Sequence, residues 1–164
     1  MANIYSDAAD AGAKTPETQF ATGTVTVPFV FDNVAISHNS PVDELYCAKI
    51  PAGATITAAT LSNIGSEGEA STTMTLKVVQ TGSATKTISA ALTSTQTTQK
   101  VMSAALGLPY RVPVESSTVS KTAYLTATAG GASIATTDNV QVAGTVTYTF
   151  QRRDLGVDHS ASDF

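Results

Sequence analysis

The residues that could support chemistry are few, and they match no known catalytic motif. The densest group of ionisable side chains is Asp32, His38, Asp43 and Glu44, which fall within one short stretch. Imidazole and carboxylate groups at such spacing could bind a metal ion or form an acid–base pair. A metal site also needs convergent ligands and a second shell that orients them, and closeness in sequence supplies neither. We therefore interpret these residues as a solvated loop and expect no metal site.

Three smaller candidates lead to the same interpretation. Glu67 and Glu69 could bind a hard cation through oxygen atoms, but two loop carboxylates are more simply explained as solvated. The stretch 82–87 superficially resembles a phosphate-binding loop but lacks the second glycine before its lysine. Cys47 shares a strand face with Leu45 and has no neighbouring base, so we expect it to be buried and inert. The sequence therefore indicates no catalytic residue, no cofactor and no enzyme activity.

Composition narrows the classes of partner. The chain has 164 residues, which suit one domain, and only 13% of them are charged. Nine Lys and Arg against thirteen Asp and Glu provide no basic surface for nucleic acid. Apolar runs are too short to span a membrane, and the N-terminus lacks the basic and apolar regions of a secretory signal. We therefore expect synthesis in the cytoplasm and no nucleic-acid or membrane partner.

Most of the chain alternates apolar and polar residues with a period of two, which is typical of half-buried β-strands. Between residues 21 and 31 the apolar positions are Val25, Val27, Phe29 and Phe31, and threonines occupy the opposite face. Threonine suits that face because its β-branch favours an extended backbone and its hydroxyl can bond to water. Further strands are predicted near 44–50, 54–63, 71–81, 84–93, 95–103, 117–129 and 140–151, with a short one at 132–137.

Turn residues separate these runs. The run Ile50-Pro51-Ala52-Gly53 predicts a type I turn with proline at i+1 and glycine at i+3. Further turns are predicted at Gly82-Ser83, Gly130-Gly131 and Asp138-Asn139. The stretch 99–107 allows at most one helical turn. About eight strands of this length predict an all-β fold, an antiparallel, jelly-roll-like β-sandwich.

Three segments are expected along the chain. An extended N-terminal arm covers 1–20, the β-sandwich body covers 21–151, and a polar C-terminal tail covers 152–164. The arm and the tail carry too few apolar residues to fold alone, so we expect them to dock on a partner. The contact residues selected within them are Ile4, Tyr5, Phe20, Arg152 and Arg153.

Several stretches carry a resemblance to a known family. The segment 44–61, a strand followed by a Pro-Ala-Gly turn and a second apolar strand, resembles small head proteins of tailed bacteriophages. The runs 122–131 and 143–150 are similar to the closing hairpin of those proteins, and the opening residues 1–6 are similar to the start of phage and cyanophage virion proteins. The segment 77–87 departs from the pattern, because it lacks the Gly-Asp segment that follows the third strand in the family.

The resemblance implies a capsid cement (decoration) protein with a jelly-roll-like fold, no enzymatic activity and no cofactor. Such a protein binds the outside of the expanded phage head as a homotrimer or homodimer, and it clamps neighbouring subunits of the major capsid protein. Two other functions stay open: a tail, neck or other minor virion protein, and a soluble carbohydrate-binding β-sandwich module. The carbohydrate module would need exposed rings on one surface, such as Tyr46, Tyr110 or Tyr124.

Overall fold

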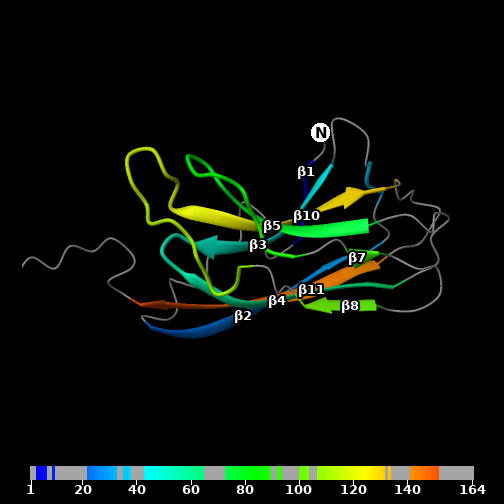
Figure 1. Ribbon diagram of the computed structural model, residues 1–164, viewed down its shortest axis with the longest axis horizontal. Helices are drawn as coiled ribbons and strands as arrows, with labels where there is room; N and C mark the ends of the chain where they lie inside the picture. The colour runs from blue at the N-terminus through cyan, green and yellow to red at the C-terminus, as the bar shows by residue number, and fades with distance from the viewer. Residues whose placement is uncertain are drawn as a thin grey trace, which may run out of the picture.

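The alternating runs form strands, and the computed structural model arranges these strands in two facing sheets (Figure 1). The long strands are β2 (Thr22–Phe31), β3 (Glu44–Pro51), β4 (Thr55–Ile64), β5 (Thr73–Gln80), β10 (Thr122–Gly130) and β11 (Gln141–Gln151). The short strands are β1 (Asn3–Tyr5), β6 (Lys86–Thr87), β7 (Leu92–Thr93), β8 (Lys100–Ser103) and β9 (Tyr110–Arg111). The structure describes residues 3–6, 9, 22–32, 35–37, 43–64, 73–89, 92–93, 100–103, 107–131, 133 and 141–151.

The long strands β2, β3, β4 and β5 alternate between the two sheets, β10 then pairs with β5 in the same sheet, and β11 returns to the other sheet. The first sheet has the order β1-β3-β10-β5-β6, with β7 also paired to β5, and forms the upper layer of Figure 1. The second sheet has the order β2-β11-β4-β8, with β9 also paired to β4, and forms the lower layer. Most hydrogen-bonded neighbours are therefore distant in sequence, as in Greek-key and jelly-roll folds. The prediction of a jelly-roll-like β-sandwich is confirmed.

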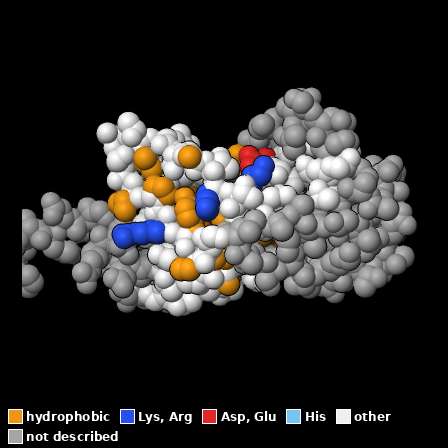
Figure 2. Space-filling model, in the orientation of Figure 1, with side chains coloured by type: hydrophobic (Ala, Val, Ile, Leu, Met, Phe, Trp, Pro, Cys, Tyr) orange, Lys and Arg blue, Asp and Glu red, His pale blue; other side chains and the backbone are white. Residues whose placement is uncertain are grey.

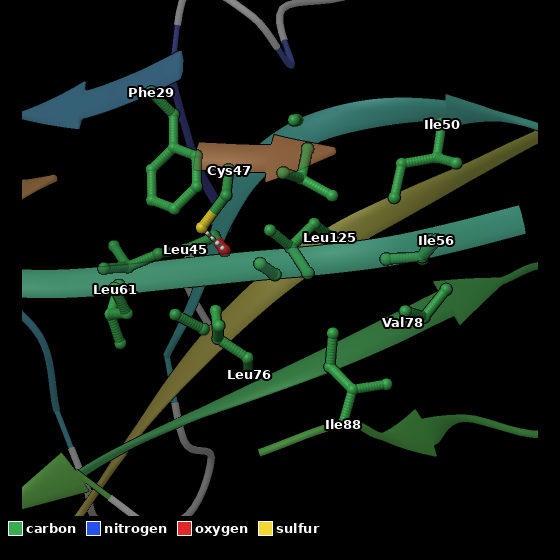
Figure 3. Packing of buried hydrophobic residues seen from close by; sticks show 14 of the residues in the cluster. Phe29, Leu45, Cys47, Ile50, Ile56, Leu61, Leu76, Val78, Ile88 and Leu125 are labelled. Carbon is green, nitrogen blue, oxygen red and sulfur yellow. Dashed lines mark hydrogen bonds between the residues drawn. The ribbon is translucent and has the colours of Figure 1, made fainter. Parts of the chain in front are cut away.

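The core lies between the layers and is built from the apolar face of each strand (Figure 3). On β5 the burial alternates at every residue, with Met74, Leu76 and Val78 inside. On β10 the inward residues Ala123, Leu125 and Ala127 are fully buried. Because each sheet presents one apolar face, stacking the two faces removes both from water, and this burial is the main stabilising contribution.

The expected elements and the observed ones differ in two places. The run 84–93 contains two short strands, β6 and β7, in place of one. The stretch 99–107 contains β8, which pairs with β4, so the helical turn considered there is wrong for residues 100–103, and the strand predicted at 95–103 is confirmed for those residues. None of the described residues forms a helix that could cross a membrane. The short strand expected at 132–137 and the turn at Asp138-Asn139 lie outside the described residues, apart from Ser133.

The turn after β3 is also different from the prediction. The amide of Ala54 donates to the carbonyl oxygen of Pro51 over 3.2 Å, so Pro51 is the first residue of the turn. Gly53 then occupies position i+2 with a φ of +80°, which is the signature of a type II turn. The predicted type I turn begins one residue too early. The prediction placed Pro51 at position i+1, whereas the structure places Gly53 at position i+2, where a left-handed backbone is required.

The described part of the N-terminal segment joins the first sheet. Strand β1 pairs in parallel with the edge of β3, with Ile4 opposite Leu45, and this is the one parallel pairing among the described strands. Ser6 continues the contact, since its amide donates to the carbonyl oxygen of Tyr46 over 3.0 Å and its hydroxyl donates to the carbonyl oxygen of Cys47. Residues 3–6 therefore cover the edge of β3 in this chain.

Candidate docking surface

Three connections meet at one end of the sandwich, which we call the loop end. It consists of the turn 51–54, the turn 80–83 and the loop 107–121, and it lies at the left of Figure 1. Backbone bonds tie these connections together: Ala52 donates to Lys121 over 3.0 Å, and Val112 donates to Ala54 over 2.8 Å. Ser120 donates in turn to Thr81 over 3.0 Å. The long loop is thereby fixed to both neighbouring turns along its length.

A buried glutamine, Gln80, is hydrogen-bonded to the loop 107–121 at two points. The Nε2 atom of Gln80, at the end of β5, donates to the carbonyl oxygen of Pro113 over 3.1 Å and to that of Ser120 over 2.7 Å. Gln80 is almost fully buried, so these two bonds satisfy carbonyl groups that water cannot reach freely. One side chain thus holds both ends of the 113–120 segment, and the loop end is rigid before any partner binds.

The loop end displays an apolar centre with charges around it. Val114 is 38% exposed and is one of two large hydrophobic residues that stand out to solvent among the described residues. Pro109 in the same loop is also exposed, and the exposed charged residues of the loop are Arg111, Glu115 and Lys121. Figure 2 shows apolar side chains gathered on this part of the surface with Lys and Arg between them. An apolar centre with a charged rim is the usual composition of a protein–protein interface.

The loop end also contains half-buried apolar residues. Leu108 and Tyr110 pack against the core, and burial raises the pKa of the Tyr110 phenol above its ordinary value of 10.0. A β-carbon on Gly107 would lie 3.1 Å from the end of Lys86, so the lysine side chain reaches from β6 to the start of the loop. The sequence alone does not indicate this surface, because the run 108–114, with prolines at 109 and 113, shows no apolar periodicity.

A second surface is the outer face of the lower sheet, which carries threonines on three neighbouring strands. The hydroxyls of Thr26 and Thr147 are 2.9 Å apart, and those of Thr60 and Thr145 are 2.8 Å apart. Cross-strand bonds of this kind link β2, β11 and β4 side by side and hold the threonine rotamers. We call these residues, with the exposed Thr24, the threonine face; it carries no charge.

The residues first considered for chemistry do not form a site among the described residues. Asp32 accepts a hydrogen bond from the side chain of Gln141, and Asp43 accepts one from the amide of Ser37 over 2.9 Å. These carboxylates therefore organise the loops in which they lie. No group of three or more His, Cys, Asp or Glu side chains suited to a metal ion occurs in the described parts of the chain. His38, Glu67 and Glu69 lie outside them.

The stretch that resembled a phosphate-binding loop is the connection into β6. The amide of Ser83 donates to the carbonyl oxygen of Gln80 over 3.0 Å, which closes a tight turn with Gly82 in the left-handed region. Lys86 and Thr87 then pair with β5. A strand follows the glycine where a phosphate site needs the N-terminus of a helix, so the interpretation as a hairpin is confirmed.

The rings that a carbohydrate site would need are not exposed. Tyr46 and Tyr124 pack edge to face on the outer side of the upper sheet, with ring centroids 5.2 Å apart and planes at 77°. Both are half-buried, as is Tyr110 at the loop end. Flat, open rings on which a sugar could stack are therefore not available from these three residues.

Two of the five contact residues selected from the sequence, Ile4 and Tyr5, lie among the described residues. Ile4 is half-buried and packs against the core from β1. The backbone of Tyr5 lies in the same strand, opposite Tyr46. Phe20, Arg152 and Arg153 lie outside the described residues.

Cys47 is predicted to resist modification in the folded protein. Its side chain is fully buried, its Sγ lies 3.5 Å from the Leu45 carbonyl oxygen (Figure 3), and burial raises the pKa of the thiol well above its ordinary value of 9.0. Alkylation by iodoacetamide, followed by mass spectrometry, should be more than about a thousandfold slower than in denaturant, because reaction requires opening of the sandwich. Rapid alkylation of the native protein would contradict the burial of this residue.

The raised pKa of the Cys47 thiol makes the stability of the protein depend on pH. The folded state holds the thiol proton more tightly than the unfolded state, so the contribution of Cys47 to stability is complete below the ordinary pKa of 9.0. The free energy of unfolding is expected to fall as the pH rises above that value. Cys47→Ala should remove this part of the alkaline decline, measured by urea unfolding between neutral pH and alkaline pH.

Comparisons with known proteins show the fold. No family model matches the chain, and no curated protein matches its sequence. A chain of the capsid of Ralstonia phage GP4 superposes with a TM-score of 0.63 at 18% identity, covering 91% of this chain and 98% of that one. A chain of the cyanophage Pam1 capsid has a TM-score of 0.52 at 21% identity, covering 88% and 96%.

A third match comes from a larger chain. A chain of the infectious bursal disease virus Gx strain has a TM-score of 0.54 at 12% identity, covering 79% of this chain but only 32% of that one. The chain therefore spans about a third of that larger protein and nearly all of the two phage chains. At these identities the likeness establishes a shared jelly-roll-like β-sandwich.

Proposed function

We propose that this chain is a virion structural protein, specifically a capsid cement protein that binds the outside of an expanded phage head. The observation that carries the proposal is the likeness, over nearly the full length of both chains, to capsid chains of Ralstonia phage GP4 and cyanophage Pam1. The match in length matters because each of those chains is an almost complete counterpart of this one. The resemblance of segments 44–61, 122–131 and 143–150 to small phage head proteins supports the same function.

The proposed mechanism is thermodynamic and needs no reaction. A protein that binds only the correctly spaced shell stabilises that shell by mass action, and many symmetric copies turn modest contacts into strong retention. The loop end suits this role, because hydrogen bonds from Gln80 and the neighbouring turns fix it beforehand and little entropy is lost on binding. In this proposal Val114 inserts between neighbouring subunits of the major capsid protein, with Arg111 and Lys121 at the rim.

The terminal segments remain part of the proposal. Ile4, Tyr5 and Phe20 in the arm, and Arg152 and Arg153 in the tail, are proposed as additional contacts with the major capsid protein. Because β1 pairs with β3 at the edge of the upper sheet, Ile4 and Tyr5 would make this contact from that edge, and the residues that follow Ala9 would extend it.

The experiment that tests the function is a copy count on purified particles. Particles are isolated on a density gradient from a lysate that contains this chain, before and after head expansion, and quantified by mass spectrometry against the major capsid protein. A cement protein should be found on expanded heads only, in on the order of hundreds of copies. Tens of copies or fewer would favour a tail or neck protein, and absence from particles would contradict a virion function.

Val114→Asp is predicted to weaken binding to expanded heads by about tenfold or more. The substitution places a charge in the apolar centre of the loop end, where binding would bury it without a partner. Heads stripped of this chain are incubated with increasing amounts of the variant, and the bound fraction is measured after sedimentation.

The matched control is Val30→Asp, which makes the same change at the other exposed valine, opposite Ala143 and toward the end of the lower sheet remote from the loop end. Both variants should keep the circular dichroism of a β-sandwich. Equal binding by Val114→Asp and the parent protein would remove the loop end from the proposed interface.

A further inference from the structure

The two sheets have four outer edges, and three of them are short. In the upper sheet the edges are β1, with three residues, and β6 with β7, with two residues each. In the lower sheet one edge consists of β8, with four residues, together with the two-residue β9. Short strands and lysines, as at Lys86 and Lys100, are the usual means by which proteins prevent a sheet edge from pairing with another chain.

The fourth edge, β2, lacks this protection. It is ten residues long, and along its whole length it pairs with β11 on one side only, among the described residues. It contains no charged residue, and it runs along the lower margin of the molecule in Figure 1. Pro28 removes a single donor, which leaves the amides of residues 22–27 intact, and Val30 is 50% exposed. A long, uncharged edge strand is a template for strand addition.

We propose that β2 pairs antiparallel with β2 of a second copy of this chain, so that the two lower sheets form one continuous sheet across a two-fold axis. Antiparallel pairing of identical strands places each residue opposite a residue of the same strand, so a charged edge would bring like charges together. The sequence of β2 is self-compatible because it consists of threonine, glycine, proline, valine and phenylalanine. The same pairing joins the threonine faces of both copies into one uncharged surface.

The symmetry of the pairing also favours a second copy of this chain over a strand from a different protein. A strand from a different protein could pair with β2 in either direction and would need no self-compatibility. A second β2 is limited to registers in which Pro28 does not interrupt the ladder, which centres the contact on residues 22–27. Thr24 and Thr26 are both exposed on the outer side of this stretch, so they lie close to the proposed axis.

The first test is the oligomeric state of the purified full-length protein. Sedimentation equilibrium, without any capsid present, is expected to show a dimer. Thr26→Lys should raise the dissociation constant at least about tenfold, because it brings two lysines together at the axis. The control Thr57→Lys adds the same lysine on the exposed side of the inner strand β4 and should remain a dimer. A monomeric or trimeric parent protein, or an unaffected Thr26→Lys dimer, would overturn the proposal.

The second test holds even if the lysine variant fails to fold. The chain has one cysteine, Cys47, which is buried, so an introduced cysteine reports on its own position. Under mild oxidation, Thr24→Cys or Thr26→Cys should form a disulfide-linked dimer in high yield, since paired strands bring Cα atoms within the range that a disulfide spans. Thr57→Cys should remain uncrosslinked. Equal crosslinking at position 57, or none at positions 24 and 26, would overturn the proposed pairing.

Discussion

Gly144→Ala is expected to destabilise the sandwich by about 3 kcal/mol, because the added methyl group has no room between its neighbours. Gly144 lies in the middle of β11, between β2 and β4. A β-carbon at this position would come within 2.1 Å of the Thr60 carbonyl oxygen and 2.5 Å of the Phe29 Cζ atom. Neither atom can move alone, since one belongs to the backbone of β4 and the other to a buried ring. The alanine variant must therefore separate paired strands or displace the core.

The measurement is thermal and urea unfolding of the variant beside the parent protein. For a chain of this size, a loss of about 3 kcal/mol corresponds to a fall in Tm of roughly 6–12 °C. Gly130→Ala is the matched control, because its β-carbon would meet only the side-chain hydroxyl of Thr73, at 2.9 Å. The hydroxyl can rotate away, so this variant should lose much less stability. Similar losses in both variants would show that close approach at Gly144 is not the cause.

Gly82→Ala is expected to have a comparable effect, of about 2–4 kcal/mol, with a different structural consequence. Gly82 has a φ of +82°, which a residue with a β-carbon adopts at a cost. The added β-carbon would also lie 1.8 Å from the carbonyl oxygen of Thr118, so the loop must withdraw. Withdrawal breaks the bond from the Ser120 amide to the Thr81 carbonyl oxygen and weakens those made by Gln80.

Hydrogen exchange distinguishes this local effect from general destabilisation. In the Gly82→Ala variant the amide of Ser120 should exchange much faster, while amides of β10 and β11 keep an exchange rate set by global unfolding. Binding to expanded heads should fall with the loss of loop order. Thr81→Ala, at the neighbouring exposed position, should change neither property. Unchanged exchange at Ser120 in Gly82→Ala would mean that the glycine is not what permits the loop to close on this turn.

The type and the face of the long strands could be predicted from the sequence. In β2, Phe29 and Phe31 are buried while Thr24 and Thr26 are exposed, as their alternation indicates. The burial of Cys47 followed from the same reasoning. These predictions succeed because alternation is a property of neighbouring residues: an extended backbone directs consecutive side chains to opposite sides wherever the strand lies in the fold.

The short elements could not be predicted. Strand β9 covers two residues, and β1 covers three, so neither has enough residues to show a period. The split of 84–93 into two strands depends on their pairing with β5. The turn after β3 was misplaced because the sequence permits both turn types, and the decision rests on the hydrogen bonds that Gly53 and Ala52 make with the distant residues Val112 and Lys121.

The sequence alone determines that this chain forms β-strands with one apolar and one threonine-rich face, and that two such sets of strands must stack. Tertiary structure decides which strands pair, and hence that β2 is left as a long edge and that three connections meet at the loop end. The reason is physical. A strand face is set by local backbone geometry, whereas a partner strand is chosen by loop closure and by packing across the core between residues far apart in the chain.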